Sequence, residues 1–147
     1  MSNDEDKKGV PASARFERGM ALKRDVLGGD YVDAAWADAQ KDDFAMAIQQ
    51  MMTETGWGTV WGRPGLDVKT RLMLNLAMLT ALNRPHELAI HLKGALRNGV
   101  TRDEVREILI HTGPYCGWPA SLDAIRVARR VLAELDAAAG SGESAPS

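Results

Sequence analysis

The chain has 147 residues, of which 45% are hydrophobic and 26% are charged, and its formal net charge is −2. This length fits one globular domain with its own core, and the near-balanced charge excludes nucleic-acid binding through bulk electrostatics. A single cysteine excludes an internal disulfide and any Cys-x-x-Cys redox or zinc motif. No apolar run reaches membrane-spanning length and no signal peptide is recognisable, so we expect a soluble, cytoplasmic protein without membrane contact.

Polar terminal segments flank a region of helical patterning. Residues 1–14 carry no apolar stripe and the chain ends in GSGESAPS, so residues 1–14 and 138–147 are predicted to be flexible tails. Residues 15–137 are predicted to form one domain. Strand-type alternation is nowhere sustained, and the pattern predicts an all-α domain of six or seven helices.

The first half of the chain predicts three short helices and then a loop. Apolar residues at helical spacing mark the helices over 16–27, 32–36 and 44–52. The expected breaks and caps are Gly28-Gly29, Asp30, and Asp42 or Asp43. Four glycines and Pro64 predict a loop over 56–65. In this loop Trp57 and Trp61 either form an active-site wall, with Arg63 binding an anion, or are buried at a subunit contact.

Residues 67–82 form a helix with apolar residues on nearly every side, which predicts burial on nearly every side. Arg71 stands near its start. An arginine is costly to bury without an acidic partner or an anionic ligand. Arg71 is therefore a candidate to bind an anionic substrate, although a solvated or ion-paired arginine is the alternative.

The next two helices have the clearest boundaries. Pro85 suits the first turn of a helix over 84–98, and Gly99 suits the left-handed position that ends it. Thr101 and Glu104 then form a capping box. The sequence therefore predicts a tight connection between two helices at residues 98–101.

Glu87 and His91 lie four residues apart on the helix over 84–98, so their side chains share one face. A carboxylate beside an imidazole raises its pKa, orients it and fixes its tautomer, as proton transfer requires. The alternative is an ordinary solvated pair. The order H-E-L-A-I-H places the histidines five apart, on different faces, so we exclude a zinc site on this helix.

Residues 111–119 are predicted to form a sharp, rigid connection to the last helix, because two glycines and two prolines lie there. His111, Tyr115 and Cys116 are candidates to line a pocket. Cys116 has no resolving cysteine and no adjacent cation, so an inert thiol is the alternative to a nucleophile.

These segments together resemble the carboxymuconolactone decarboxylase family of the alkylhydroperoxidase-like superfamily, over about residues 15–135. The similarity is to the branch that acts on 4-carboxymuconolactone (γ-carboxymuconolactone). The motifs that carry it are Arg18-Gly-Met with Val26-Leu-Gly28, Trp57-Gly-x-x-Trp61-x-Arg-Pro-Gly-Leu66, Glu87-Leu-x-x-His91-Leu with Asn98-Gly-Val-Thr101, and Tyr115-Cys-Gly-x-Pro-Ala120. The superfamily's peroxidases carry two cysteines where Arg84 and Glu87 stand here, so thiol peroxidase chemistry is not implied. Pro114 and the bulky Trp118 depart from the family's pattern.

The resemblance implies a helical, homo-oligomeric enzyme, a trimer or hexamer. Its reaction is cofactor- and metal-independent decarboxylation of 4-carboxymuconolactone to 3-oxoadipate enol-lactone and CO2 in protocatechuate (β-ketoadipate) catabolism. His91, positioned by Glu87, is the candidate acid or hydrogen-bond donor. Substrate contacts are expected from Arg71, then Arg63 and Arg97, with Trp57 or Trp61 as an apolar wall and with His111, Tyr115 and Cys116 as further candidates. A lactone hydrolase or isomerase on the same scaffold, or a non-catalytic small-molecule-binding oligomer, are the alternatives.

Overall fold

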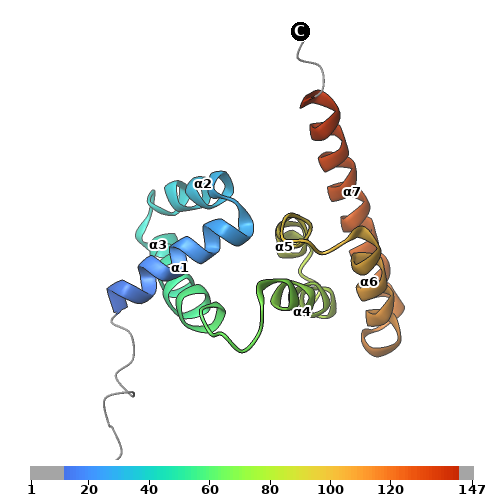
Figure 1. The fold of residues 1–147 in the computed structure, drawn as a ribbon, viewed down its shortest axis with the longest axis horizontal. Coiled ribbons are helices and arrows are strands. Elements are labelled where there is room, and N and C mark those ends of the chain that lie inside the picture. The colour runs from blue at the N-terminus through green and yellow to red at the C-terminus, as the bar shows by residue number, and fades with distance from the viewer. Residues whose placement is uncertain (1–11, 143–147) are drawn as a thin grey trace, which may run out of the picture. The chain divides into compact units, whose positions relative to one another are not determined.

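The computed structural model describes residues 12–142, and in that part of the chain every regular element is a helix (Figure 1). The predicted all-α class is confirmed, with seven α-helices and one π-helix among the described residues. The predicted tails fall largely outside the described residues. The first helix starts at Ala12 and the last helix ends at Gly142, so the helices extend past both ends of the predicted domain. No described helix is both long and apolar enough to cross a membrane.

The helices group into two compact units, with the boundary in sequence after Leu66. A single domain over residues 15–137 therefore stays a prediction. The first unit contains α1 (Ala12–Leu27), α2 (Gly29–Ala39), α3 (Asp43–Met51) and the π-helix η2 (Met52–Trp61). The second contains α4 (Val68–Ala81), α5 (Pro85–Arg97), α6 (Arg102–Cys116) and α7 (Trp118–Gly142).

The caps of the first unit match the sequence pattern only in part. Gly28 breaks the chain between α1 and α2 with a φ of 97°, a left-handed value that favours glycine. The prediction that Asp30 caps α2 is wrong, because Gly28 makes the whole turn and Asp30 already lies in the first helical turn. Asp42 rather than Asp43 caps α3, and its carboxylate accepts a hydrogen bond from the backbone N–H of Ala45 at 2.7 Å.

The predicted loop over 56–65 is wrong for its first half, because helix continues to Trp61. The reason is tertiary packing of η2 against α1. A Cβ on Gly58 would lie 2.1 Å from the carbonyl oxygen of Arg15, and one on Gly19 would lie 2.0 Å from that of Thr53. The Arg18 guanidinium also donates two hydrogen bonds to the Gly58 carbonyl, at 2.6 and 3.0 Å. The glycines therefore allow two backbones to touch, and they do not mark a loop.

Gly58→Ala is expected to destabilise the protein by about 1–3 kcal/mol or more, because α1 must move away from η2 to admit the new methyl group. Gly56→Ala, two residues earlier in the same helix, is the matched control. Nothing lies within 4 Å of a Cβ there, so alanine should be neutral or stabilise by up to about 1 kcal/mol. Urea denaturation of both variants measures the difference. Equal stability of the two variants would show that the close backbone approach is not energetically important.

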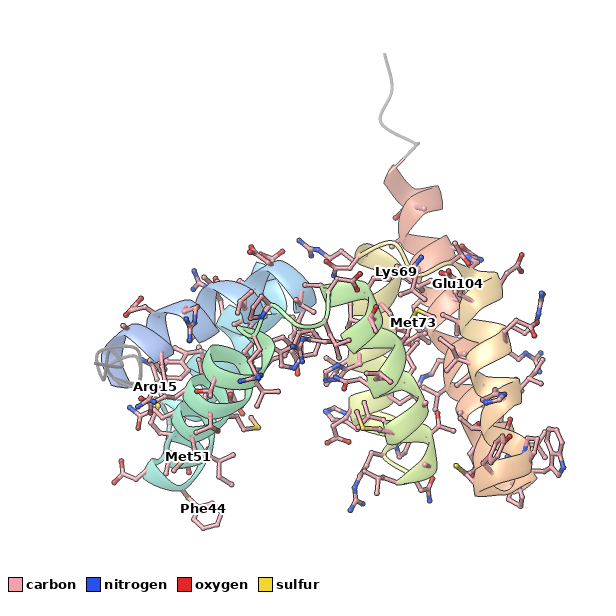
Figure 2. The ribbon with its side chains drawn as sticks, turned by 60° about the horizontal axis from the view of Figure 1, so that its bottom comes forward. Arg15, Phe44, Met51, Lys69, Met73 and Glu104 are labelled. Atoms are coloured by element: carbon pink, nitrogen blue, oxygen red, sulfur yellow. The ribbon has the colours of Figure 1, made fainter. Side chains whose placement is uncertain are left out.

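The second unit has its core between α4, α5, α6 and α7. Leu72 and Leu76 of α4 and Leu92 of α5 are almost completely buried. Ion pairs on the outside join neighbouring helices: Lys69 of α4 to Glu104 of α6 at 3.0 Å, shown side by side in Figure 2, and Lys93 of α5 to Glu134 of α7 at 2.9 Å. Side chains that complete the core are Leu88, Ala95, Val105, Leu109, Ala124, Val127 and Val131.

The predicted ends of α5 and the predicted start of α6 are confirmed. Pro85 is the first residue of α5, and Gly99 follows its end with a φ of 91°. Thr101 and Glu104 form the full capping box, in which each side chain accepts a hydrogen bond from the other residue's backbone N–H. These local signals fix how α5 leads into α6.

The prediction that 111–119 forms a connection is wrong for most of its length. Helix α6 continues to Cys116 and contains Pro114, and only Gly117, with a φ of 97°, separates it from α7. Pro114 has no N–H to donate to the carbonyl four residues earlier, but it stands in the last turn, so the disruption is confined to the end of the helix. Gly113 makes room for Trp118, since a Cβ on Gly113 would lie 2.3 Å from that indole.

Helix α4 is buried on one side only, contrary to the sequence prediction. Within the chain, Leu74, Met78 and Leu82 are 47%, 52% and 64% exposed. The helix therefore presents an apolar stripe that neither α5 nor α6 covers. Apolar side chains are also exposed on the first unit, among them Phe44 and Met51 along α3 (Figure 2).

Candidate active site

His91 lies at the centre of α5, half-buried against α4. Its Nδ1 atom is 3.2 Å from Nδ2 of Asn75 on α4, which is hydrogen-bond distance. The two helices are joined by only three residues, 82–84, and form an antiparallel hairpin that brings these side chains together. The buried leucines on either side of Asn75, Leu72 and Leu76, hold that part of α4 in place.

Burial lowers the pKa of His91 below its usual value, and the negative charge of Glu87 opposes this shift without cancelling it. The sequence argument expected the carboxylate to raise the pKa, and for the net shift that expectation is wrong. The reason is desolvation, which disfavours the charged imidazolium more than one exposed carboxylate favours it. His91 is therefore neutral at neutral pH.

Arg71 stands one helical turn before Asn75 on α4, so the two side chains share a face with Cβ atoms about 5–6 Å apart. It is half-buried. Arg71 and Asn75 thus share a face of α4, and Asn75 contacts His91 of α5, so we call these three residues the polar strip. Glu87 lies one turn from His91 on α5 and is exposed.

Asn75 is a candidate site residue that the sequence pattern did not identify. It is the only polar residue between Arg71 and Thr80, in an otherwise uninterrupted apolar run. A polar side chain in such a run needs a partner when the helix packs, because burying an unpaired amide costs free energy. The isolated polar residue is visible in the sequence, but its partner His91 is given only by the packing of α4 against α5.

Three further candidates lie elsewhere on the second unit. His111, Tyr115 and Cys116 line an open groove of about 360 Å³ between α6 and α4, with the rings of His111 and Tyr115 5.1 Å apart. On α4 this groove is lined by Ala77, Met78 and Ala81, and its lining includes neither Asn75 nor His91. The structure therefore does not bring these three residues together with His91.

The remaining candidates are distributed over both units. Arg97 lies in the exposed last turn of α5, six residues after His91 and roughly 120° away round the helix. Trp57 and Trp61 belong to η2 in the first unit, where their rings stack with centroids 4.5 Å apart and Trp57 is buried. Arg63 follows η2 and is exposed. Among residues 12–142, no group of three or more His, Cys, Asp or Glu side chains is placed to hold a metal ion.

The arrangement on the α4–α5 hairpin has a defined chemical capacity. A neutral imidazole can donate a hydrogen bond to developing negative charge, and a neighbouring guanidinium can bind a carboxylate. The fold defines an all-helical protein, and the α4–α5 hairpin carries its candidate acid–base site.

The chain belongs to the carboxymuconolactone decarboxylase family, whose profile matches residues 47–130. It is 39% identical over 120 residues to the nitrosuccinic acid decarboxylase NpaB of Metarhizium robertsii, covering 82% of each chain. It is 37% identical over 121 residues to the 4-carboxymuconolactone decarboxylase of Acinetobacter baylyi, covering 82% of this chain and 89% of that one. Both relatives are decarboxylases, which supports a carboxy-lyase.

Proposed function

We propose that the protein decarboxylates 4-carboxymuconolactone to 3-oxoadipate enol-lactone and CO2. The observation that carries the proposal is the 37% identity to 4-carboxymuconolactone decarboxylase over most of both chains. The polar strip Arg71–Asn75–His91 supports it, because the substrate is a dianion and its reaction develops negative charge on oxygen. We place this reaction in protocatechuate catabolism in the cytoplasm.

In the proposed reaction the protein contributes mainly electrostatic stabilisation. The bond to the leaving carboxylate breaks, and its electron pair moves through the ring C=C into the lactone carbonyl, which becomes a dienolate oxygen. A ring carbon then takes up a proton. The substrate supplies its own electron acceptor, so the proposal requires neither an organic cofactor nor a metal ion.

Each residue of the strip has a proposed task. Arg71 binds a substrate carboxylate, and His91 donates a hydrogen bond to the developing oxygen anion. Glu87 is close enough to act on His91 through its charge. Trp57 or Trp61 as an apolar wall, and Arg63, Arg97, His111, Tyr115 and Cys116 as further substrate contacts, stay candidates.

Nitrosuccinate is the second candidate substrate, because the chain is 39% identical to a nitrosuccinic acid decarboxylase. That molecule is also a dicarboxylate with an electron acceptor beside the leaving carboxylate, since a nitro group takes up the electron pair as a nitronate. Its decarboxylation makes the same demands, a cation for the remaining carboxylate and a donor for the developing oxygen charge.

The test is CO2 release by the purified protein from each substrate, in EDTA and without added cofactor. Release from 4-carboxymuconolactone with the higher kcat/KM supports the first candidate, and a higher kcat/KM for nitrosuccinate replaces it with the second. Ring opening without CO2 would identify a lactone hydrolase. Binding without turnover of either compound would indicate a non-catalytic protein.

We also propose that the chain forms a homo-oligomer and that the exposed stripe of α4, Leu74, Met78 and Leu82, lies in the interface. Contiguous exposed apolar side chains are typical of association surfaces. Light scattering should give a multiple of the 16.0 kDa chain mass, and Met78→Lys should lower that mass. Ala133→Lys adds the same charge to an exposed position of α7 and should not. A monomeric wild type would contradict the proposal.

A further inference from the structure

We propose that helix α3 of one copy of the chain docks into the groove between α6 and α7 of a second copy. Asp43 of the first copy then pairs with Arg129 of the second. The inference rests on the homo-oligomer proposed above and adds a contact that is separate from the α4 stripe. It does not depend on which substrate the protein uses.

Helix α3 carries an apolar face that its own unit does not bury. Phe44, Ile48 and Met51 follow the spacing i, i+4 and i+7, which places their side chains on one side of a helix. All three are exposed, Phe44 to 85%, and no residue of α3 is buried (Figure 2). Short helices gain most of their stability by packing such a face. We call these three residues the docking face.

The groove between α6 and α7 offers an apolar surface for such a helix. Its volume is about 420 Å³. Leu109 and Ala128 in its lining are buried, whereas Ile110 is 42% exposed. The other apolar residues of the lining are Val105, Ile125 and Leu132. An apolar groove between two helices is the surface that binds an amphipathic helix of a partner.

The docking face and the groove have the same length. Phe44 and Met51 are seven residues apart on α3, and Ile125 and Leu132 are seven residues apart on the α7 side of the groove. At a rise of 1.5 Å per residue, each stretch is about 10 Å long. The apolar face of α3 is therefore long enough to cover the groove and no longer.

Asp43 gives the docking face a negative charge at its edge. It directly precedes Phe44 and lies about 100° from it round the helix. The carboxylate of Asp42 is already used to cap α3. Asp43 is exposed, and its side chain forms no ion pair with any of residues 12–142. Residues 42–54 contain no lysine or arginine that would balance this charge.

Arg129 gives the groove the opposite charge. It belongs to the α7 side of the lining and is exposed. The other two arginines of the lining already have partners, which are Asp136 for Arg102 and Asp103 for Arg106. Over the described part of the chain, Arg129 forms no ion pair. A carboxylate and a guanidinium that are both unpaired in one copy complement each other across a contact between two copies.

The charges also decide between the two apolar grooves of the second unit. The groove between α6 and α4 contains no lysine or arginine in its lining, so it offers no partner for Asp43. It also includes Met78 of the α4 stripe, which we have proposed to lie in a different contact. The α6–α7 groove is therefore the better fit for α3.

The proposed contact joins two different surfaces, and every copy carries both. Two copies can therefore exchange their α3 helices so that each lies in the groove of the other. Repetition of the same contact round a larger rotation gives a closed ring. Either arrangement leaves no docking face without a groove.

The first experiment reverses each charge alone. Asp43→Arg places an arginine against Arg129 of the second copy, and Arg129→Asp places an aspartate against Asp43. Because like charges across an interface repel, each variant should raise the dissociation constant of this contact about 10- to 100-fold. Light scattering over a range of protein concentrations measures it. Arg130→Asp makes the same charge change at the neighbouring exposed position of α7 and should have no effect.

The decisive experiment mixes the two single variants in equal amounts. In the mixture, the arginine introduced at position 43 meets the aspartate introduced at position 129 of the other variant. The second contact of that pair joins the unchanged Asp43 and Arg129. We therefore expect the mixture to recover the wild-type mass, although neither variant does so alone. A chain that carries both reversals should recover it as well.

Recovery in the chain with both reversals but not in the mixture would overturn the proposal, because it would place the contact within one chain. Unchanged mass in both single variants would also overturn it. If Met78→Lys still lowered the mass in that case, the proposed homo-oligomer would stand without the α3 contact. A circular dichroism melt of each variant checks that the helices remain folded.

The apolar part of the contact is tested by Phe44→Ser. Its side chain is 85% exposed, so its loss should not affect folding. If it is buried in the groove of a second copy, the dissociation constant should rise about 10- to 100-fold, as for a central apolar anchor. An unchanged dissociation constant would contradict docking through this face.

Discussion

His91→Ala is expected to lower kcat for CO2 release about 10²–10⁴-fold, the range that covers loss of a positioned donor or acid. His91 is half-buried and contacts Asn75, whereas the other two histidines, His86 and His111, are exposed. Under the proposed mechanism, its loss removes the group that stabilises the developing oxygen anion. Single-turnover measurement of CO2 release separates this effect from a change in product release.

His86→Ala is the matched control, because His86 lies on the same helix but is exposed in its first turn. It should retain wild-type turnover. His91→Gln keeps a donor of similar reach and should recover part of the lost rate. Equal turnover in wild type and His91→Ala would refute the assignment of His91, whatever the substrate.

Arg71→Gln is expected to lower kcat/KM about 10- to 100-fold, mainly through a higher KM. A charge-assisted hydrogen bond to a carboxylate is worth about 1.5–3 kcal/mol, and each 1.4 kcal/mol is a tenfold change. Arg71→Lys should recover only part of this loss, because an ammonium cannot form the bidentate pair. Steady-state kinetics over a range of substrate concentrations separates KM from kcat.

Arg130→Gln on α7 removes a positive charge from an exposed position and controls for the general loss of charge. It should leave KM unchanged. A circular dichroism melt of Arg71→Gln checks that α4 remains folded, since Arg71 lies near the start of that helix. An unchanged KM in folded Arg71→Gln would move the substrate carboxylate to one of the other candidate arginines.

Local signals in the sequence predicted local structure well. The capping box of Thr101 and Glu104, the first-turn Pro85 and the left-handed Gly99 all act within a few residues, and each is found as predicted. The predictions that failed concern residues whose conformation depends on a distant partner. The low helix propensity of glycine predicts a loop at Gly58, but Gly58 lies in helix η2, which packs closely against the backbone at Arg15.

In the candidate site, too, the features that depend on local sequence were predicted and those that depend on packing were not. The sequence placed Glu87 and His91 on one helical face, because that relation depends only on the helical repeat. It could not give the direction of the His91 pKa shift, since burial is a property of the packed hairpin. Nor could it give Asn75 as the partner, because residues 16 positions apart meet only when α4 and α5 pack.

The sequence by itself thus determined the helical class, the helix boundaries with strong caps, and the family motifs that lead to a decarboxylase. These features depend on propensity, hydrogen bonds within one turn and side-chain periodicity, all of which are encoded locally. Tertiary structure decided which glycines allow close backbone contact, which face of α4 stays exposed, and which amide contacts His91. Those features depend on desolvation and on contacts between segments far apart in the chain, and such contacts exist only once the helices have packed.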